Sequence, residues 1–309
     1  MDTKYRNILL FVLLVIVILL IINKIEHPVV KDINNLNPLK SYNVYTYIEQ
    51  PTNYNKELKI QLLSKNDDIP IFFKYCLQLM KKNFGNLIIL TPNNYLDYVS
   101  DFPIKMCPSS EYTLKTRVDL LSAFILEKYG GLFLSPGTIV YDKKDVLSNT
   151  KSQDIVTFGR SKFTPNSYIL GSKHNSEFIK LYKNTMIDNL SKNHSNNILS
   201  ELLTNYKVNQ YHYSGEYDGT VNSLNNQLFI TDFLGSSDIN FKNKENLSLI
   251  SVPYEEILRN QEYKWFNNLS QEQFIQSDLY VARLLRKLLK IWLIIYNNYY
   301  KKPKWVLNH

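Results

Sequence analysis

Hydrophobic and polar positions alternate between helical and strand-like patterns through the middle of the chain. Apolar side chains recur every three or four positions, which predicts amphipathic helices, over residues 69–82, 93–99, 113–129 and 176–190. Short apolar runs predict buried strands at 86–91, 132–134, 138–141 and 154–158. Strands that alternate with helices in this order predict an α/β sheet domain.

The N-terminus carries the longest apolar run of the chain. Every residue from 8 to 22 is apolar, and the 21 residues of 5–25 would span about 31 Å as a helix. The alternatives are a buried helix of a soluble core and a cleaved signal peptide. However, no stripe of the run is polar, and no small-residue cleavage site follows it. We predict a single-pass signal anchor in a membrane, with a short cytosolic N-terminus in type II orientation, although the flanking charges are nearly balanced.

The segment 26–66 after this run contains three prolines, many asparagines and no sustained hydrophobic period. This composition predicts a stem between the anchor and the α/β domain.

Positive charge gathers at the C-terminal end. The chain has 36 Lys and Arg against 28 Asp and Glu, and residues 278–309 hold six of these eight excess charges. Arg283, Arg286, Lys287 and Lys290 share one face of a predicted helix. This predicts a basic amphipathic helix and tail on an anionic membrane surface, or else a helix docked on the domain with its basic face in solvent. Nucleic acid is not expected as a partner, because the charge is terminal.

Glycine and cysteine are both scarce. The two cysteines, Cys76 and Cys107, exclude a disulfide-dense scaffold and a cysteine-based zinc module, and they could form at most one bridge. Only nine residues are glycine, and three of them, Gly130, Gly131 and Gly137, fall within eight positions. The first two end the helix predicted at 113–129.

The segment from Arg117 to Val140, RVDLLSAFILEKYGGLFLSPGTIV, resembles the DXD-type sugar-transferring glycosyltransferases, and most closely the capsular polysaccharide synthesis proteins. Weaker landmarks at 217–219 and 263–266 extend the resemblance over about 68–285. The resemblance implies a GT-A-like mixed sheet flanked by helices, over residues 67–277. It also implies a nucleotide-sugar donor, which a divalent cation, Mn²⁺ or Mg²⁺, would help to bind. The implied donor-binding residues are Asp119, Gly130, Gly131, Ser135, Gly137 and Thr138.

The chain departs from this family pattern at the turn after the glycine pair. The turn should supply two carboxylates one residue apart, but it contains Ser135-Pro136-Gly137. The arginine expected three residues after Asp119 is Ser122. Three accounts stay open: another group holds the ion, basic residues replace it, or the chain is inactive. The candidate metal ligands are Asp142, Asp145, His212 and Asp218, and the candidate catalytic residues are Asp142 and Asp218.

Each candidate also has a structural interpretation. Asp119 could merely cap its helix or form an ion pair, and His212 could be a packed neighbour of aromatic rings. Gly137 could serve a type II turn, and Asp218-Gly219 is a turn dipeptide. The sequence therefore predicts a membrane-anchored glycosyltransferase that acts on a glycan or lipid-linked acceptor. The alternative is an inactive GT-A-like binding or scaffold protein tethered to the membrane.

Overall fold

The computed structural model describes residues 43–49, 69–107, 109–142, 146–161, 164–190 and 198–291, all of them in the unit Tyr42–His309. The predicted signal anchor at 5–25, Asp145 and the segment 292–309 lie outside the described residues. Within the described residues, no helix is both long enough and apolar enough to cross a membrane.

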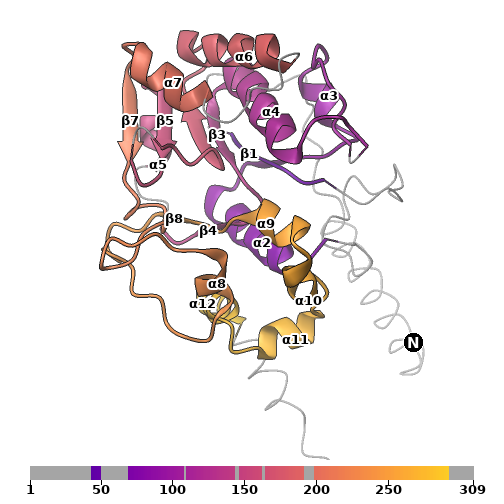
Figure 1. The fold of residues 1–309 in the computed structure, drawn as a ribbon, viewed down its shortest axis with the longest axis vertical. Helices are drawn as coiled ribbons and strands as arrows, with labels where there is room; N and C mark the ends of the chain where they lie inside the picture. The colour runs from indigo at the N-terminus through magenta and orange to yellow at the C-terminus, as the bar shows by residue number, and fades with distance from the viewer. Residues whose placement is uncertain are drawn as a thin grey trace, which may run out of the picture. The chain divides into compact units, whose positions relative to one another are not determined.

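Six strands form one mixed sheet in the order β2-β1-β3-β6-β5-β7 (Figure 1). Their bounds are β1 Val44–Tyr47, β2 Leu87–Leu90, β3 Gly131–Leu134, β5 Ile155–Phe158, β6 Ile169–Ser172 and β7 Gln210–Tyr213. β1 runs parallel to β2 and β3, β5 runs parallel to β7, and β6 is antiparallel to β3 and β5. All strands except β6 therefore point the same way, and their carboxyl ends share one edge of the sheet.

Helices flank this sheet. The longer ones are α2 Ile71–Phe84, α4 Leu114–Tyr129, α6 Glu177–Leu190, α7 Ile198–Asn205 and α12 Tyr280–Leu289. The shorter ones are α3 Tyr95–Tyr98, α5 Val146–Asn149, α8 Ile230–Leu234, α9 Tyr254–Arg259, α10 Lys264–Asn267 and α11 Gln271–Gln276, with a 3₁₀ turn at Gln261–Tyr263. β2 and β3 lie on opposite sides of β1, so right-handed crossovers place α2 and α4 on opposite faces, as Figure 1 shows.

Local sequence signals set the ends of α4, the longest described helix. Thr113 caps its start by accepting a hydrogen bond from the Thr116 amide, and Gly130 ends it with a φ of 63°. The positions predicted to be apolar are all buried, namely Leu114, Val118, Leu121, Ile125 and Leu126. The four helices and four strands predicted between residues 69 and 190 are confirmed to within a few residues, whereas β6 was not predicted.

A second, smaller sheet lies beside α2. It pairs β4, Thr138–Val140, with β8, Leu249–Ser251, in antiparallel register. α2 packs against β4, α11 and α12. Aromatic rings fill these contacts: Phe72 lies 5.5 Å from Phe266, and Tyr75 stacks on Phe274 at 5.6 Å. Cys76 of α2 and Cys107 are both free thiols, so no bridge joins them.

The stem predicted for residues 26–66 is wrong over Val44–Tyr47. These residues form β1, which lies between β2 and β3 and is buried along its whole length. The sequence signal for a strand was present, because Val, Tyr and Thr favour extended backbone. The neighbouring prolines and asparagines obscured it. The domain therefore includes a central strand from before the predicted boundary at residue 67.

The C-terminal helix is docked on the domain. α12 packs against α2, α8 and α11, and its apolar side chains Val281, Leu284 and Leu285 are buried. Arg286, predicted to lie on an open basic face, is 5% exposed and donates hydrogen bonds to the carbonyl oxygens of Ile275 and Ser277. The prediction of a four-residue basic face is therefore wrong for this residue, because its neighbours in space come from α11.

Candidate functional site

The carboxyl edge of the main sheet has a switch point between β1 and β3. The chain leaves β1 through α2 to β2 on one side, and it returns through α4 to β3 on the other. Ligands of open α/β sheets bind in the crevice outside the strands at such a point. Glu49 follows β1 here, and Ser135 follows β3.

Asp119 lies on α4 close to this switch point. It is 8% exposed and forms an ion pair with Lys115, one helical turn earlier. Burial raises the pKa of the Asp119 carboxyl above its ordinary value, and Lys115 opposes this shift. The helix-borne ion pair that the sequence allowed is confirmed, and the lysine side chain keeps its outer part in solvent.

A second ion pair ties β1 to α4. The buried guanidinium of Arg117 donates to the Glu49 carboxylate, and its Nε donates to the carbonyl oxygen of Tyr112 at 3.2 Å. Arg117 and Asp119 are two positions apart on the helix, so they point in different directions. This pair fixes the end of β1 against the first turn of α4.

Glu255 of α9 brings another carboxylate to the same place. It is 8% exposed, and its Oε1 is buried without a hydrogen-bond partner among the described residues. Burial raises its pKa; Arg259 opposes the shift, and the charge of Asp119 adds to it. The Tyr254 hydroxyl next to it is likewise buried and without a partner in the described part of the chain. Unsatisfied buried polar atoms are rare and require an explanation, such as a bound ligand.

Tyr168 links these groups to the sheet. Its ring lies edge-on to Tyr254 with the centroids 5.4 Å apart, and its carbonyl oxygen accepts a hydrogen bond from the Ser135 amide at 2.7 Å. Burial raises the pKa of its hydroxyl, and the nearby charges of Glu255 and Asp119 raise it further. The hydroxyl therefore stays neutral and can donate or accept a hydrogen bond.

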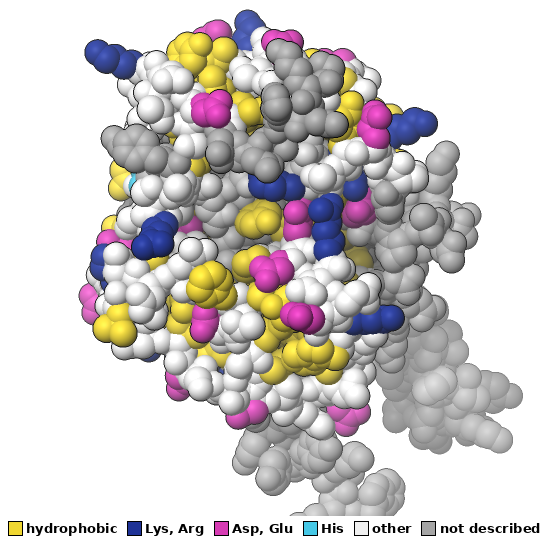
Figure 2. Space-filling view, viewed as in Figure 1, with side chains coloured by type: hydrophobic (Ala, Val, Ile, Leu, Met, Phe, Trp, Pro, Cys, Tyr) yellow, Lys and Arg dark blue, Asp and Glu magenta, His cyan; other side chains and the backbone are white. Residues whose placement is uncertain are grey.

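These side chains form one group, which we call the switch-point cluster: Glu49, Lys115, Arg117, Asp119, Tyr168, Tyr254 and Glu255. Figure 2 shows acidic and basic side chains gathered across the middle of the viewed face, where this edge lies. Sequence reasoning found Asp119 and missed the other carboxylates. Pro253 followed by two glutamates did signal a helix start, but not its contact with α4.

The turn after β3 does not present side chains as predicted. Ser135, Gly137 and Thr138 are all buried, and the Ser135 and Thr138 hydroxyls lie 3.1 Å apart in a hydrogen bond. The Thr138 amide donates to the Ser135 carbonyl, which closes a β-turn. Gly137 lacks the positive φ of a type II turn, so that interpretation is wrong. A Cβ on Gly137 would lie 2.8 Å from the Val252 carbonyl oxygen, because the β8–α9 connection covers the turn.

Gly130 and Gly131 lie at the opposite end of β3 from this turn. Both have positive φ, and a Cβ on Gly131 would lie 2.3 Å from the Asn43 carbonyl oxygen. A Cβ on Gly130 would lie 2.5 Å from the His174 amide. The glycine pair therefore ends α4 and lets β3 approach β1, and the structure does not bring it to the switch-point cluster.

Asp218 is buried in a turn, as its structural interpretation predicted. Its Oδ1 accepts from the amide and hydroxyl of Thr220, and its Oδ2 accepts from the Asn166 side chain at 3.3 Å. Gly219 follows with a φ of 66°. Burial raises the pKa of Asp218 to about 7, so the group titrates near neutral pH.

The predicted metal ligands do not converge. His212 lies on β7, where its Nδ1 is 3.1 Å from the Thr157 hydroxyl, and Asp142 follows β4. No group of three His, Cys, Asp or Glu side chains among the described residues is arranged to hold a metal ion. The donor set therefore does not fit a divalent ion held by the protein alone.

Comparison with known proteins gives one family and two solved structures. The family described as capsular polysaccharide synthesis protein matches residues 63–277. The PaToxG glycosyltransferase is similar over 53% of this chain, with 12% identity and a TM-score of 0.34. The glycosyltransferase GlyE of Streptococcus pneumoniae TIGR4 is similar over 85%, with 15% identity and a TM-score of 0.40. The chain spans 66% and 64% of those two structures, and no curated protein matches it.

Proposed function

Because the chain belongs to the capsular polysaccharide synthesis protein family, we propose that it is a glycosyltransferase. It transfers a sugar from a nucleotide-sugar donor to a glycan or lipid-linked acceptor. The position of Asp119 carries the proposal: a buried carboxylate, paired with a lysine, at the switch point of an open α/β sheet. The apolar run at 5–25 supports the further proposal that the enzyme is anchored in a membrane.

The reaction breaks the bond between the anomeric carbon and the diphosphate oxygen. The acceptor hydroxyl oxygen forms the new bond to that carbon and gives its proton to a base. Asp119 accepts hydrogen bonds from hydroxyl groups of the bound donor, as a carboxylate beside a ribose or hexose does. The partnerless Oε1 of Glu255 supplies a second acceptor for the same hydroxyl-rich ligand.

Negative charge develops on the leaving diphosphate and has to be stabilised. Lys115 and Arg259 both reach solvent beside the two buried carboxylates, and Arg259 is close enough to Glu255 to lower its pKa. We assign the diphosphate to these two cations and route no step through a divalent ion.

Calorimetric titration of nucleotide diphosphates and nucleotide sugars, with and without Mn²⁺, tests the proposal. Asp119→Asn removes the charge but keeps the size of the side chain. We expect donor affinity to fall about 10- to 100-fold, because a hydrogen bond to a charged group contributes about 1.5–3 kcal/mol. Glu127→Gln is the matched control, because Glu127 pairs with Lys183 near the other end of the same helix.

Equal donor affinity in Asp119→Asn and the wild type would remove Asp119 from the site. If no nucleotide sugar binds the wild type, the alternative gains: a GT-A-like binding protein without transfer activity. The turn Ser135-Pro136-Gly137, which lacks carboxylates, favours that alternative.

A further inference from the structure

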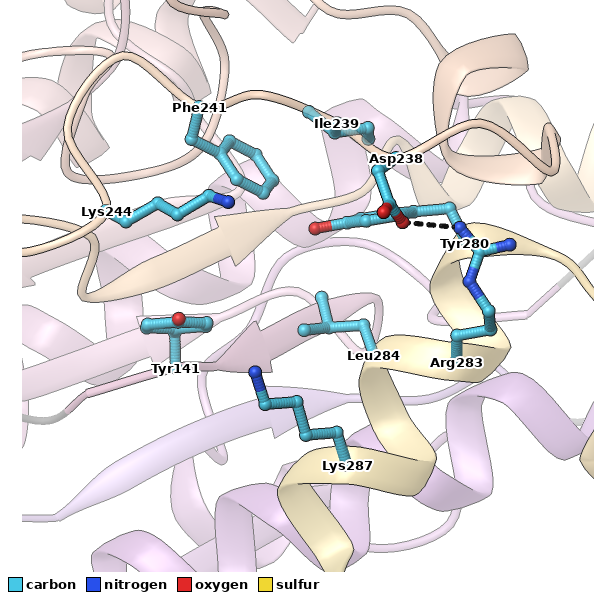
Figure 3. A pocket seen from close by; sticks show the side chains of 9 residues that line it. All are labelled: Tyr141, Asp238, Ile239, Phe241, Lys244, Tyr280, Arg283, Leu284 and Lys287. Atoms are coloured by element: carbon cyan, nitrogen blue, oxygen red, sulfur yellow. Dashed lines mark hydrogen bonds and ion pairs between the residues drawn. The ribbon is translucent and has the colours of Figure 1, made fainter.

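A cavity of about 310 Å³ opens away from the switch-point cluster, between α12 and the loop after α8 (Figure 3). Tyr141, the residue after β4, forms one wall. Ile239 and Leu284 contribute apolar surface from the loop and the helix. Neither the sequence analysis nor the proposed transfer reaction uses this cavity. Its volume is in the range of small-molecule sites.

Two lysines converge on this cavity from distant parts of the chain. Lys244 enters from the loop and Lys287 from α12, as Figure 3 shows. Among the described residues, neither ammonium group has a carboxylate partner. The cavity therefore presents two cations without paired anions, which a bound anion would satisfy.

The other charged groups of the cavity are paired with each other. Arg283 bonds to the Asp238 carboxylate at 2.6 Å and to the Asp278 carboxylate at 3.0 Å. It also donates to the carbonyl oxygen of Ser236 at 2.6 Å. These bonds hold the loop against α12 and cancel the charge of Asp238. The excess positive charge of the cavity is thus that of the two lysines.

Aromatic rings form much of the remaining wall. Tyr141, Phe241 and Tyr280 all line the cavity, and the Phe241 and Tyr280 rings lie 6.2 Å apart. Burial raises the pKa of the Tyr280 hydroxyl to about 12, so it stays neutral and can donate a hydrogen bond. Aromatic faces pack against the C–H face of a sugar ring, while hydroxyl and ammonium groups bind its polar edge.

We propose that this cavity is a second carbohydrate site, specific for a sugar that carries a carboxylate or a phosphate. Lys244 and Lys287 bind the anionic group, and Tyr141, Phe241 and Tyr280 hold the ring. The cavity lies at the far end of β4, about 10 Å along the strand from the turn at the sheet edge. Its use for an acceptor or product glycan rests on the proposed function, whereas the binding itself does not.

Saturation-transfer NMR on the full chain tests the binding with glucuronate, glucose 1-phosphate and glucose. We expect the two anions to bind at least 10-fold more tightly than glucose, because only they pair with the lysines. A preference between them identifies the source: a uronate-containing glycan, or a phosphate-linked sugar.

Lys244→Gln and Lys287→Gln should each weaken anion binding about 10-fold or more. The controls are Lys242→Gln and Lys290→Gln, exposed lysines next to the same loop segment and just after α12 that do not line the cavity. Asp119→Asn should leave the binding unchanged. Because that variant acts on the donor site, failure of the proposed function leaves this result readable.

Three results would overturn the proposal. Glucose could bind as tightly as the anions, or the control and cavity variants could lose affinity equally. Alternatively, vesicles containing phosphatidylglycerol could bind through Lys287 without competition from the free anions. That last result would make the surface a lipid contact.

Discussion

Asp119 and Glu255 lie at the same sheet edge although one belongs to α4 and the other to α9. Burial raises the pKa of both carboxyls, and the charge of Asp119 adds to the shift at Glu255. Two carboxylates without enough cations are costly in a site from which water is excluded. A ligand that donates hydrogen bonds reduces this cost, which is the physical basis for placing the donor here.

Gly131 shows how a single missing side chain permits the sheet. Gly131→Ala should destabilise the protein by about 3 kcal/mol or more, because a Cβ would lie 2.3 Å from the Asn43 carbonyl oxygen at a φ of 105°. Gly85→Ala is the control: its φ is also positive, but no atom lies within 4 Å, so about 1 kcal/mol is expected. Equilibrium urea unfolding measures both. Equal costs for the two variants would contradict the argument.

Asp218 predicts a pH dependence of stability. Its folded pKa of about 7 exceeds the ordinary value of 3.8, so the folded state holds the proton more tightly. Its contribution is complete below pH 3.8 and is lost as pH rises to about 7, by up to about 1.4 kcal/mol per pH unit. Asp218→Asn removes this titration. Relative to wild type, the variant should therefore gain about 2–3 kcal/mol between pH 5 and pH 8. Parallel stability curves from urea unfolding would show that Asp218 does not titrate in this range.

At the scale of elements, α12 shows that an amphipathic pattern can be correct while its partner is misassigned. The alternation of leucines and basic residues does form a helix, but the leucines face α2, α8 and α11. Its basic residues have different surroundings. Arg286 is buried, Arg283 is paired, and only Lys287 and Lys290 are exposed.

Arg286 distinguishes a docked helix from a helix lying on lipid. Arg286→Gln should destabilise the protein by about 2–3 kcal/mol, because two carbonyl oxygens at the end of α11 lose a charged donor. Lys290→Gln should change stability by less than about 0.5 kcal/mol, since its side chain is exposed. Urea unfolding of both variants checks this. A helix bound only to lipid would give two small and equal effects.

For the molecule as a whole, β1 decides where the domain begins. A chain that starts at residue 67, the predicted boundary, lacks the strand between β2 and β3. It loses the burial of Val44, Tyr45 and Tyr47, which are at most 1% exposed. Each such side chain stabilises a fold by about 1.5–3 kcal/mol, and together they approach the whole stability of a domain.

We therefore expect the chain from residue 67 to be insoluble or unfolded, and the chain from residue 41 to unfold cooperatively. Circular dichroism and urea unfolding of the two chains test this. A folded chain that starts at residue 67 would show that β1 is dispensable.

The sequence alone determined what short-range pattern can determine. Apolar periods located α2, α4, α6 and most strands, capping residues set the ends of α4, and the YGG segment indicated the family. Only the tertiary structure decided where these elements meet. Val44–Tyr47 becomes the strand beside β3, Gly130-Gly131 ends a helix away from the site, and Glu255 approaches Asp119. The physical reason is that each of these outcomes depends on contacts between residues far apart in the chain. Propensity and periodicity describe only a residue and its near neighbours.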